Sequence, residues 1–366
     1  MRSGGAIEYA RGMRRSPLAF VLPAQHGLIS GGNIYNQRLI DALTALTVPR
    51  SPDASDAQRP VRTLSVAEGQ AAMRAGAPGT YFIDTLNLGD FVELLAQPRA
   101  RQRTILIVHH LPSLEPGIDP ADPALAIERA TLPRFDGFLT TSSYTTALLR
   151  ARGHETQAIM TVPPALSARD RQALRCPPVV RGLLVGNLIA RKGVLPFLHA
   201  LDEAVTPDDR FDIDVVGGAV LDPDYARACA RLIASSPRLG PRLHLRGEVA
   251  HADMDAYYGA ASVVISASSM ETFGMALQEA RAWGLPILAR DGGNARNHFT
   301  PGQNGELHAT TPALVRGFLA LVRDPARMQR LFACAQAMRA GAEYTWDAAA
   351  RALLEQLAGQ LPDAGS

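Results

Sequence analysis

The chain has 366 residues, 47% of them hydrophobic and 20% charged, so it can bury a large core and is not a disordered protein. Its formal net charge of only +2 gives no case for nucleic acid as a partner, and no apolar run approaches the roughly 18 residues of a transmembrane helix. The three cysteines form no CxxC or Cys/His spacing, which argues against a disulfide framework or a zinc site and favours a reducing, cytoplasmic environment.

The length favours two domains of ordinary size. Residues 1–16 are rich in Gly and Arg without periodicity, which predicts a flexible basic tail. Peripheral contact of this basic tail with the inner face of a membrane is an open alternative, although a solvated surface is the simpler interpretation. A polar, proline-containing stretch over 166–178 predicts a linker between domains at 17–165 and 179–345, and a final helical segment covers 346–366.

The N-terminal domain is expected to begin with an apolar strand at 18–23, followed by the Gly-rich turn HGLISGGN at 26–33 and a helix at 34–46. Gly31 and Gly32 allow the backbone to approach a ligand closely, and they precede a helix N-terminus, where phosphate charge is favoured. The turn matches neither GxGxxG nor a P-loop, so the sequence contains no simple nucleotide fingerprint here.

Short strands and helices then alternate, which predicts a parallel, doubly wound sheet. The strands are expected at 61–66, 80–84, 104–108 and 137–141, and the helices at 67–75, 88–96, 123–132 and 143–151. His109 and His110 directly follow the buried strand ILIV, at the carboxyl edge where open α/β sheets bind ligands. Two tandem histidines at this edge make both of them candidate site residues.

The C-terminal domain contains the only lysine of the chain, Lys192, whereas the other 36 basic residues are arginines. A strand is expected at 182–185 and a helix at 194–204, with Gly186 turning the chain between them. Lys192 therefore lies beside Arg191, ahead of a helix N-terminus and at the carboxyl edge of a strand. These three sources of positive potential predict a diphosphate as the counterpart.

Two carboxylates mark the stretch from Ser266 to Glu306. A buried strand ends near Ile265, and Glu271 lies in the polar turn that follows it. Glu279 lies on a helix over 274–283, which Gly284 ends in a left-handed conformation and Pro286 cannot continue. The amides at the start of this helix, those of Phe273, Gly274 and Met275, suit an anion or sugar hydroxyls.

The segment ETFGMALQEARAWGLPILA, followed by DGGNARNHFTPGQNGEL, resembles the donor-site signature of family 4 retaining glycosyltransferases. That signature has Glu, two residues, Gly, a second Glu, then Ala, Gly-x-Pro and a later Gly-x-Asn-Gly. GNLIARKG also resembles the family's phosphate segment, Gly-x-x-x-x-Arg-Lys-Gly. The resemblance implies the GT-B architecture, with two doubly wound Rossmann-like domains facing across a cleft and the last helix crossing back to the N-terminal, acceptor-side domain.

The resemblance also implies a role for individual residues. Arg191 and Lys192 would neutralise the leaving diphosphate in place of a divalent metal, so no metal site is expected. Glu271 would bind sugar hydroxyls, and His109, with His110 in reserve, would support the reacting sugar. The donor- and nucleotide-binding residues would be Gly31, Gly32, Gly186, Arg191, Lys192, Val249, Phe273, Gly274, Met275 and Glu279. Among these, Glu279 would accept from the ribose hydroxyls.

The function implied by the resemblance is that of a metal-independent, retaining glycosyltransferase of the hexosyltransferase type, acting in glycan biosynthesis without a cofactor. It would move a sugar from a UDP- or GDP-sugar to a glycan, a lipid or a small molecule. Two alternatives stay open: a nucleotide-sugar epimerase of the same fold, and a catalytically silent nucleotide-binding partner in a biosynthetic complex. No carboxylate nucleophile is evident opposite the donor, so the route to retention is also open.

Overall fold

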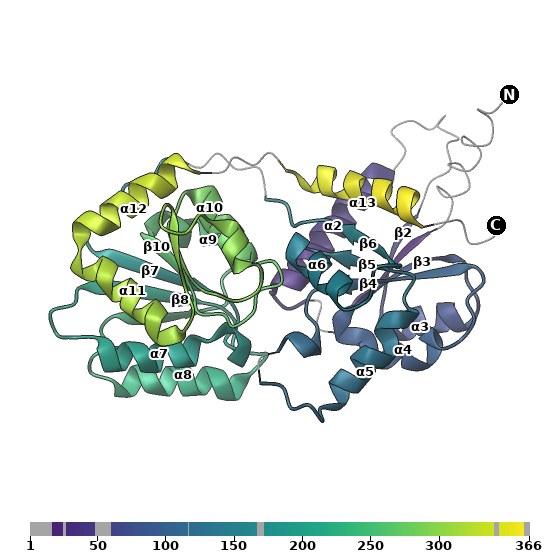
Figure 1. Ribbon diagram of the computed structural model, residues 1–366, viewed down its shortest axis with the longest axis horizontal. Helices are drawn as coiled ribbons and strands as arrows, with labels where there is room; N and C mark the ends of the chain where they lie inside the picture. Colours follow the sequence, from purple (N-terminus) through teal and green to yellow (C-terminus); the bar gives the residue numbers. More distant parts are fainter. Residues whose placement is uncertain are drawn as a thin grey trace. The chain divides into compact units, whose positions relative to one another are not determined.

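The computed structural model describes residues 17–24, 27–47, 60–115, 117–166, 172–339 and 344–361. The chain forms two compact units, Met1–Ala165 together with Tyr344–Ser366, and Leu166–Glu343. Each unit has its own parallel sheet and its own hydrophobic core (Figure 1). The tail predicted over 1–16 lies outside the described residues. Within the described ranges, no helix has both the length and the apolar content needed to cross a bilayer.

The first unit has a six-stranded sheet in the order β2-β1-β3-β4-β5-β6, with every neighbouring pair parallel. Its strands are β1 (Leu18–Val21), β2 (Val61–Leu64), β3 (Gly79–Asp84), β4 (Gln102–Val108), β5 (Gly137–Thr140) and β6 (Ala158–Thr161). Its helices are α2 (Gly31–Thr47), α3 (Val66–Arg74), α4 (Leu88–Leu95), α5 (Pro123–Thr131), α6 (Ser143–Ala151) and α13 (Trp346–Gln360). Helices α2 and α13 cover one face, and α3, α4 and α5 cover the other (Figure 1).

The second unit repeats this design with a parallel sheet in the order β12-β11-β10-β7-β8-β9. Its strands are β7 (Val180–Val185), β8 (Phe211–Val216), β9 (Leu243–Gly247), β10 (Val263–Ser266), β11 (Ile287–Arg290) and β12 (Gly305–His308). Its helices are α7 (Val194–Ala204), α8 (Pro223–Ser235), α9 (Met254–Ala260), α10 (Met275–Trp283), α11 (Thr311–Arg323) and α12 (Pro325–Ala337). Helices α7, α8 and α11 cover one face, and α9 and α10 cover the other (Figure 1).

Each sheet has one point where the strand order reverses. In the first unit the chain winds outward in opposite directions from β1 and β3, and in the second unit it does so from β7 and β10. Connections that leave toward opposite faces open a crevice at the carboxyl ends of two such strands, where open α/β sheets bind ligands. The topology thus marks one candidate site in each unit.

The sequence prediction of doubly wound α/β units is confirmed, but some elements differ from it. Helix α2 begins at Gly31 instead of Ile34, so the glycine pair forms the first turn of the helix. Strands β6 and β12, of 4 residues each, were not predicted. Of the predicted linker over 166–178, residues 167–171 lie outside the described residues, whereas Leu174 and Cys176 pack against the core of the second unit.

The buried carboxylate of Asp209 fastens the loop after α7 to the end of α11. Arg323 donates to its two oxygens at 2.7 and 2.8 Å, and the amide and hydroxyl of Thr206 donate to it at 2.8 and 3.0 Å. The hydrogen bonds from Arg323, supported by those from Thr206, outweigh burial and lower the pKa of Asp209 to about 2.

We therefore predict that Asp209→Asn lowers the free energy of unfolding at neutral pH by about 2 kcal/mol. A carboxylate whose pKa falls from 3.8 to about 2 on folding stabilises the folded state above the higher value, and it loses this effect as the pH falls through the lower one. Urea denaturation should show the difference shrinking between about pH 4 and pH 2. Asp208→Asn, at the exposed neighbouring position, is the matched control and should change little. A difference that persists undiminished at the lowest pH contradicts the assignment.

Candidate active site

The switch point of the second sheet carries Lys192, which ends a short 3-10 turn over Ala190–Lys192. Gly193 follows with a φ of 66° and turns the chain into α7. A Cβ on Gly193 would lie 2.2 Å from the carbonyl oxygen of Ala267, so only glycine fits where this turn crosses the end of β10. The turn thereby holds Lys192 beside the carboxyl ends of β7 and β10.

Gly186 lies beneath the side chain of Lys192. Its φ is 151°, and a Cβ added there would lie 3.3 Å from both Cδ and Cε of Lys192. Any larger residue would therefore press against the lysine stem. The sequence predicted Gly186 as a nucleotide-binding residue, and the structure gives it a packing role next to the lysine.

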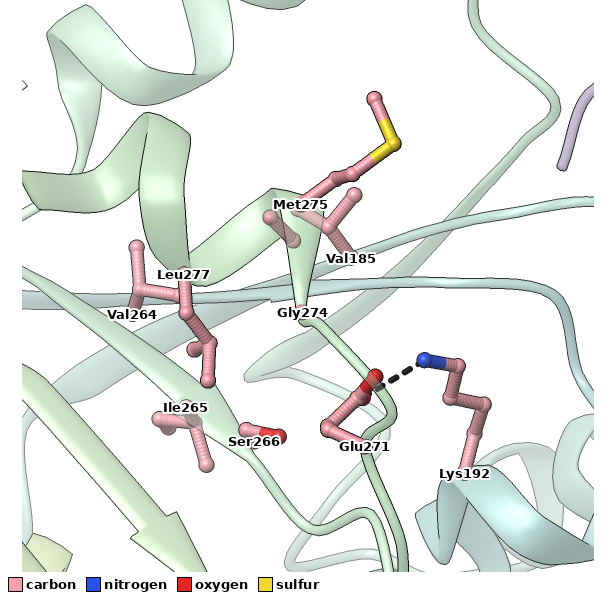
Figure 2. A pocket seen from close by; sticks show the side chains of 10 residues that line it. Val185, Lys192, Val264, Ile265, Ser266, Glu271, Gly274, Met275 and Leu277 are labelled. Atoms are coloured by element: carbon pink, nitrogen blue, oxygen red, sulfur yellow. Dashed lines mark hydrogen bonds and ion pairs between the residues drawn. The ribbon is translucent and has the colours of Figure 1, made fainter. Parts of the chain in front are cut away.

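Lys192 and Glu271 form an ion pair in which the ammonium Nζ donates to Oε1 at 2.6 Å (Figure 2). The Glu271 side chain is only 11% exposed. Burial alone raises the pKa of Glu271, but the positive charges of Lys192 and Arg191 outweigh it and hold the pKa below its usual value. Two residues that the sequence placed in separate motifs thus meet as a charged pair.

The turn that carries Glu271 is fixed from two sides. Arg191 donates from Nη1 to the carbonyl of Met270 at 3.0 Å, and its own carbonyl accepts from the amide of Ser269 at 2.9 Å. On the other side Glu271 forms a parallel bridge with Gly293. Arg191 therefore contributes both its charge and a direct attachment to the carboxylate-bearing turn.

A pocket of about 30 Å³ opens beside this ion pair (Figure 2). Its lining includes Val185, Ser266, Lys192, Glu271 and Gly274. These residues come from the ends of β7 and β10, from the lysine turn and from the start of α10. The volume suits one or two water-sized groups. The pocket is therefore only the innermost part of a site, and it does not hold a whole sugar nucleotide.

The turn before α10 is held by two side chains whose role the sequence did not reveal. The carbonyl of Phe273 accepts from Asn294 Nδ2 at 2.8 Å and from His298 Nε2 at 2.6 Å. Gly274 has a φ of 94°, and a Cβ on it would lie 3.2 Å from His298 Nε2. Burial lowers the pKa of His298, although its bond to Phe273 opposes this. By holding this turn, Asn294 and His298 orient the first backbone amides of α10, which have no acceptor inside the helix.

Glu279 on α10 is held by a neighbouring helix. The hydroxyl of Tyr258 on α9 donates to Oε2 of Glu279 at 2.6 Å, and Nδ1 of His251 lies 3.8 Å from Oε1. The Tyr258 side chain is buried. The sequence did not reveal this role of Tyr258. Val249, by contrast, lies beyond the edge strand β9 and does not line the pocket.

The first unit holds the other predicted residues at its own switch point. His109 follows β4, and its ring lies against Gly32, where a Cβ would be 3.1 Å from ring carbons. His110 instead pairs with Glu115, with Nε2 and Oε2 3.0 Å apart. The structure therefore places the ring of His109 against Gly32, the second residue of the glycine pair Gly31 and Gly32. These residues and the Lys192 site belong to separate units.

Asp-x-Asp triplets, which place two carboxylates two residues apart, occur at 212–214, 222–224 and 253–255. The first lies within β8, the second opens α8 and the third spans the start of α9. Among the described residues, no three His, Cys, Asp or Glu side chains form a group that could hold a metal ion. The metal independence implied by the family resemblance stays a prediction.

Two solved structures share this architecture, which is the GT-B fold. Sucrose-phosphate synthase from Thermosynechococcus elongatus matches with a TM-score of 0.72 and 22% identity, covering 94% of this chain and 99% of that chain. HepE from Anabaena, solved in complex with UDP-glucose, matches with a TM-score of 0.69 and 16% identity, covering 94% of this chain and 99% of that chain. At these identities the likeness shows the fold, which is GT-B.

The sequence comparison adds a family. Residues 180–324, most of the second unit, match the family Glycosyl transferases group 1. D-inositol 3-phosphate glycosyltransferase 1 from Catenulispora acidiphila is 31% identical over 178 residues, which are 47% of this chain and 40% of the relative. The match thus spans less than half the length of this curated relative. Residues 180–324 therefore resemble Glycosyl transferases group 1, while the narrower assignment to family 4 stays a prediction.

We predict that Lys192→Met lowers the free energy of unfolding at neutral pH by about 2 kcal/mol, because it leaves the Glu271 carboxylate buried without its closest partner while Arg191 remains nearby. The double variant Lys192→Met/Glu271→Gln should recover most of the loss. Since the ion pair stabilises the fold only while Glu271 is charged, the effect of Lys192→Met should fade as the pH falls below 4.5, the ordinary pKa of a glutamate, and through the lowered pKa of Glu271.

The measurement is a double-mutant cycle by urea denaturation. Arg227→Met is the control, since Arg227 and Asp224 form an ion pair on the surface, with 59% and 92% of their side chains exposed. Additive losses in the double variant contradict a coupled pair.

Proposed function

We propose that the protein is a retaining glycosyltransferase that transfers a hexose from a UDP- or GDP-sugar without a metal ion. The observation that carries the proposal is the Lys192–Glu271 ion pair at the switch point of the second sheet. It combines a cation for a phosphate with a carboxylate for sugar hydroxyls. Both residues lie in the segment that matches Glycosyl transferases group 1.

The phosphate half of the site rests on accumulated positive charge. The Lys192 side chain is 22% exposed, and its stem packs on Gly186. Arg191 adds a second charge, and the N-terminus of α7 directly follows. In a transfer reaction, negative charge builds on the departing diphosphate, and fixed cations stabilise that charge more in the transition state than in the ground state. These residues take the part that a divalent metal plays in other transferases.

The part of the site proposed for the sugar is argued from which of its groups accept and which donate hydrogen bonds. An ionised carboxylate only accepts, and a sugar hydroxyl is able to donate. Glu271, held charged by its cationic neighbours, suits such hydroxyls, and the amides at the start of α10 suit sugar or phosphate oxygens. Glu279, oriented by Tyr258, suits the two ribose hydroxyls in the same way. Retention is proposed because the two glutamates keep the spacing of the retaining-family signature.

The comparisons suggest which substrates to try first. The HepE structure contains UDP-glucose, which makes UDP-sugars the first donors to test. Curated relatives are named D-inositol 3-phosphate glycosyltransferases, so inositol 3-phosphate is the first small acceptor to test alongside glycans and lipids. Donor sugar, base and acceptor are open choices within the proposal.

The test is turnover of UDP- and GDP-hexoses with an acceptor panel that begins with inositol 3-phosphate, with NMR of the product's anomeric proton. We expect the anomeric configuration of the donor to be kept and the activity to survive EDTA. Lys192→Met should lower kcat/KM by about 10²–10³-fold, as the loss of one charge-stabilising donor does elsewhere.

Arg227→Met controls for the removal of a surface cation and should retain full activity. Loss of activity in EDTA that added metal restores contradicts metal independence. Conversion of the donor into another nucleotide sugar without an acceptor favours an epimerase. Full activity in Lys192→Met overturns the phosphate role.

A further inference from the structure

A buried hydrogen-bond relay in the first unit ends on His109. Asp84, the last residue of β3, is 1% exposed, and its Oδ1 accepts from the amide of Leu86 at 2.9 Å. Its other oxygen, Oδ2, accepts from Asn36 Nδ2 at 2.8 Å, and Asn36 itself is 1% exposed. Asn36 Oδ1 in turn lies 2.8 Å from His109 Nε2. The relay joins β3, α2 and the end of β4 at the switch point of the first sheet.

The chemistry of the three groups fixes the direction of each hydrogen bond. A carboxylate has no proton to donate, so the atom of Asn36 that faces Asp84 must be the amide nitrogen. The amide oxygen then faces His109 and accepts, which requires a proton on His109 Nε2. The same nitrogen lies 3.5 Å from Asp84 Oδ2, which is also an acceptor. Both neighbours of Nε2 therefore favour its protonated form, and the neutral ring keeps its lone pair on Nδ1.

Packing holds the ring in place. Tyr35 packs on it in a T-shaped arrangement, with ring centroids 5.5 Å apart and an interplanar angle of 80°. Gly32 lies against the ring carbons, and any side chain there would press on them. Burial lowers the pKa of His109, although the charge of Asp84 opposes this. The Gly32 position thus serves the imidazole, whereas the sequence suggested a role in the close approach of phosphate.

We infer that Asp84 and Asn36 are positioning residues that fix His109 as a neutral imidazole with its hydrogen-bond acceptor at Nδ1. The tautomer follows from the relay alone, whereas the effect of the relay on turnover rests on the proposed function.

The test is ¹⁵N NMR of the full chain labelled at histidine, at about pH 7.5, with the His109 signals assigned by their loss in His109→Gln. The wild-type protein without ligand should show Nε2 protonated and Nδ1 unprotonated. A protonated Nδ1, in either the other tautomer or the imidazolium, overturns the inference and needs no variant.

Asp84→Asn removes the carboxylate that orients Asn36, so its amide becomes free to turn. We expect the Nδ1-protonated tautomer of His109 to become populated and kcat/KM for the UDP-sugar to fall by about tenfold. Asp136→Asn is the matched control. Asp136 also accepts from a strand residue of the first unit, at 2.7 Å from the amide of Thr104, and the tautomer should stay unchanged. An unchanged His109 tautomer in Asp84→Asn contradicts the relay.

Discussion

The candidate active site depends on one ion pair, between Lys192 and Glu271, at the switch point of the second sheet. Glu271 is buried, and an isolated buried carboxylate would raise its pKa and become neutral. Lys192 and Arg191 prevent this, so the site keeps a negative and a positive group within 2.6 Å of each other. A sugar diphosphate has the complementary pair of features, hydroxyls that donate and phosphates that are negative. The ion pair therefore keeps both charged groups of the candidate site in place for the proposed ligand.

The backbone around this pair is shaped by glycines and distant hydrogen bonds. Gly193 allows the lysine turn to cross the end of β10, and Gly186 leaves room for the lysine stem. Asn294 and His298 hold the turn before α10 by the carbonyl of Phe273. The first unit uses the same principle, since Asp84 and Asn36 orient His109 from buried positions. In both units, the side chains suited to a ligand are oriented by hydrogen bonds or packing contacts from neighbouring residues.

Local features of the site could be predicted from the sequence. Gly284 adopts the left-handed conformation that ends α10, and the lone lysine follows a buried strand, as its surroundings indicated. The partners of these residues could not be predicted, because they depend on packing between distant segments. Lys192 and Glu271 are 79 residues apart, and Asn36 and Asp84 are 48 apart. Neither pair has a spacing that marks a helix face or a turn.

The most direct test of the central claim is calorimetric titration of the protein with UDP, GDP and ADP, with and without EDTA, in wild type and in Lys192→Met. We predict that one nucleotide diphosphate binds the wild-type protein equally well with and without the chelator. Lys192→Met should bind it at least about tenfold more weakly, a loss of about 1.4 kcal/mol. No binding of any nucleotide, or equal binding by the variant, would contradict the claim that this ion pair forms a diphosphate-sugar site.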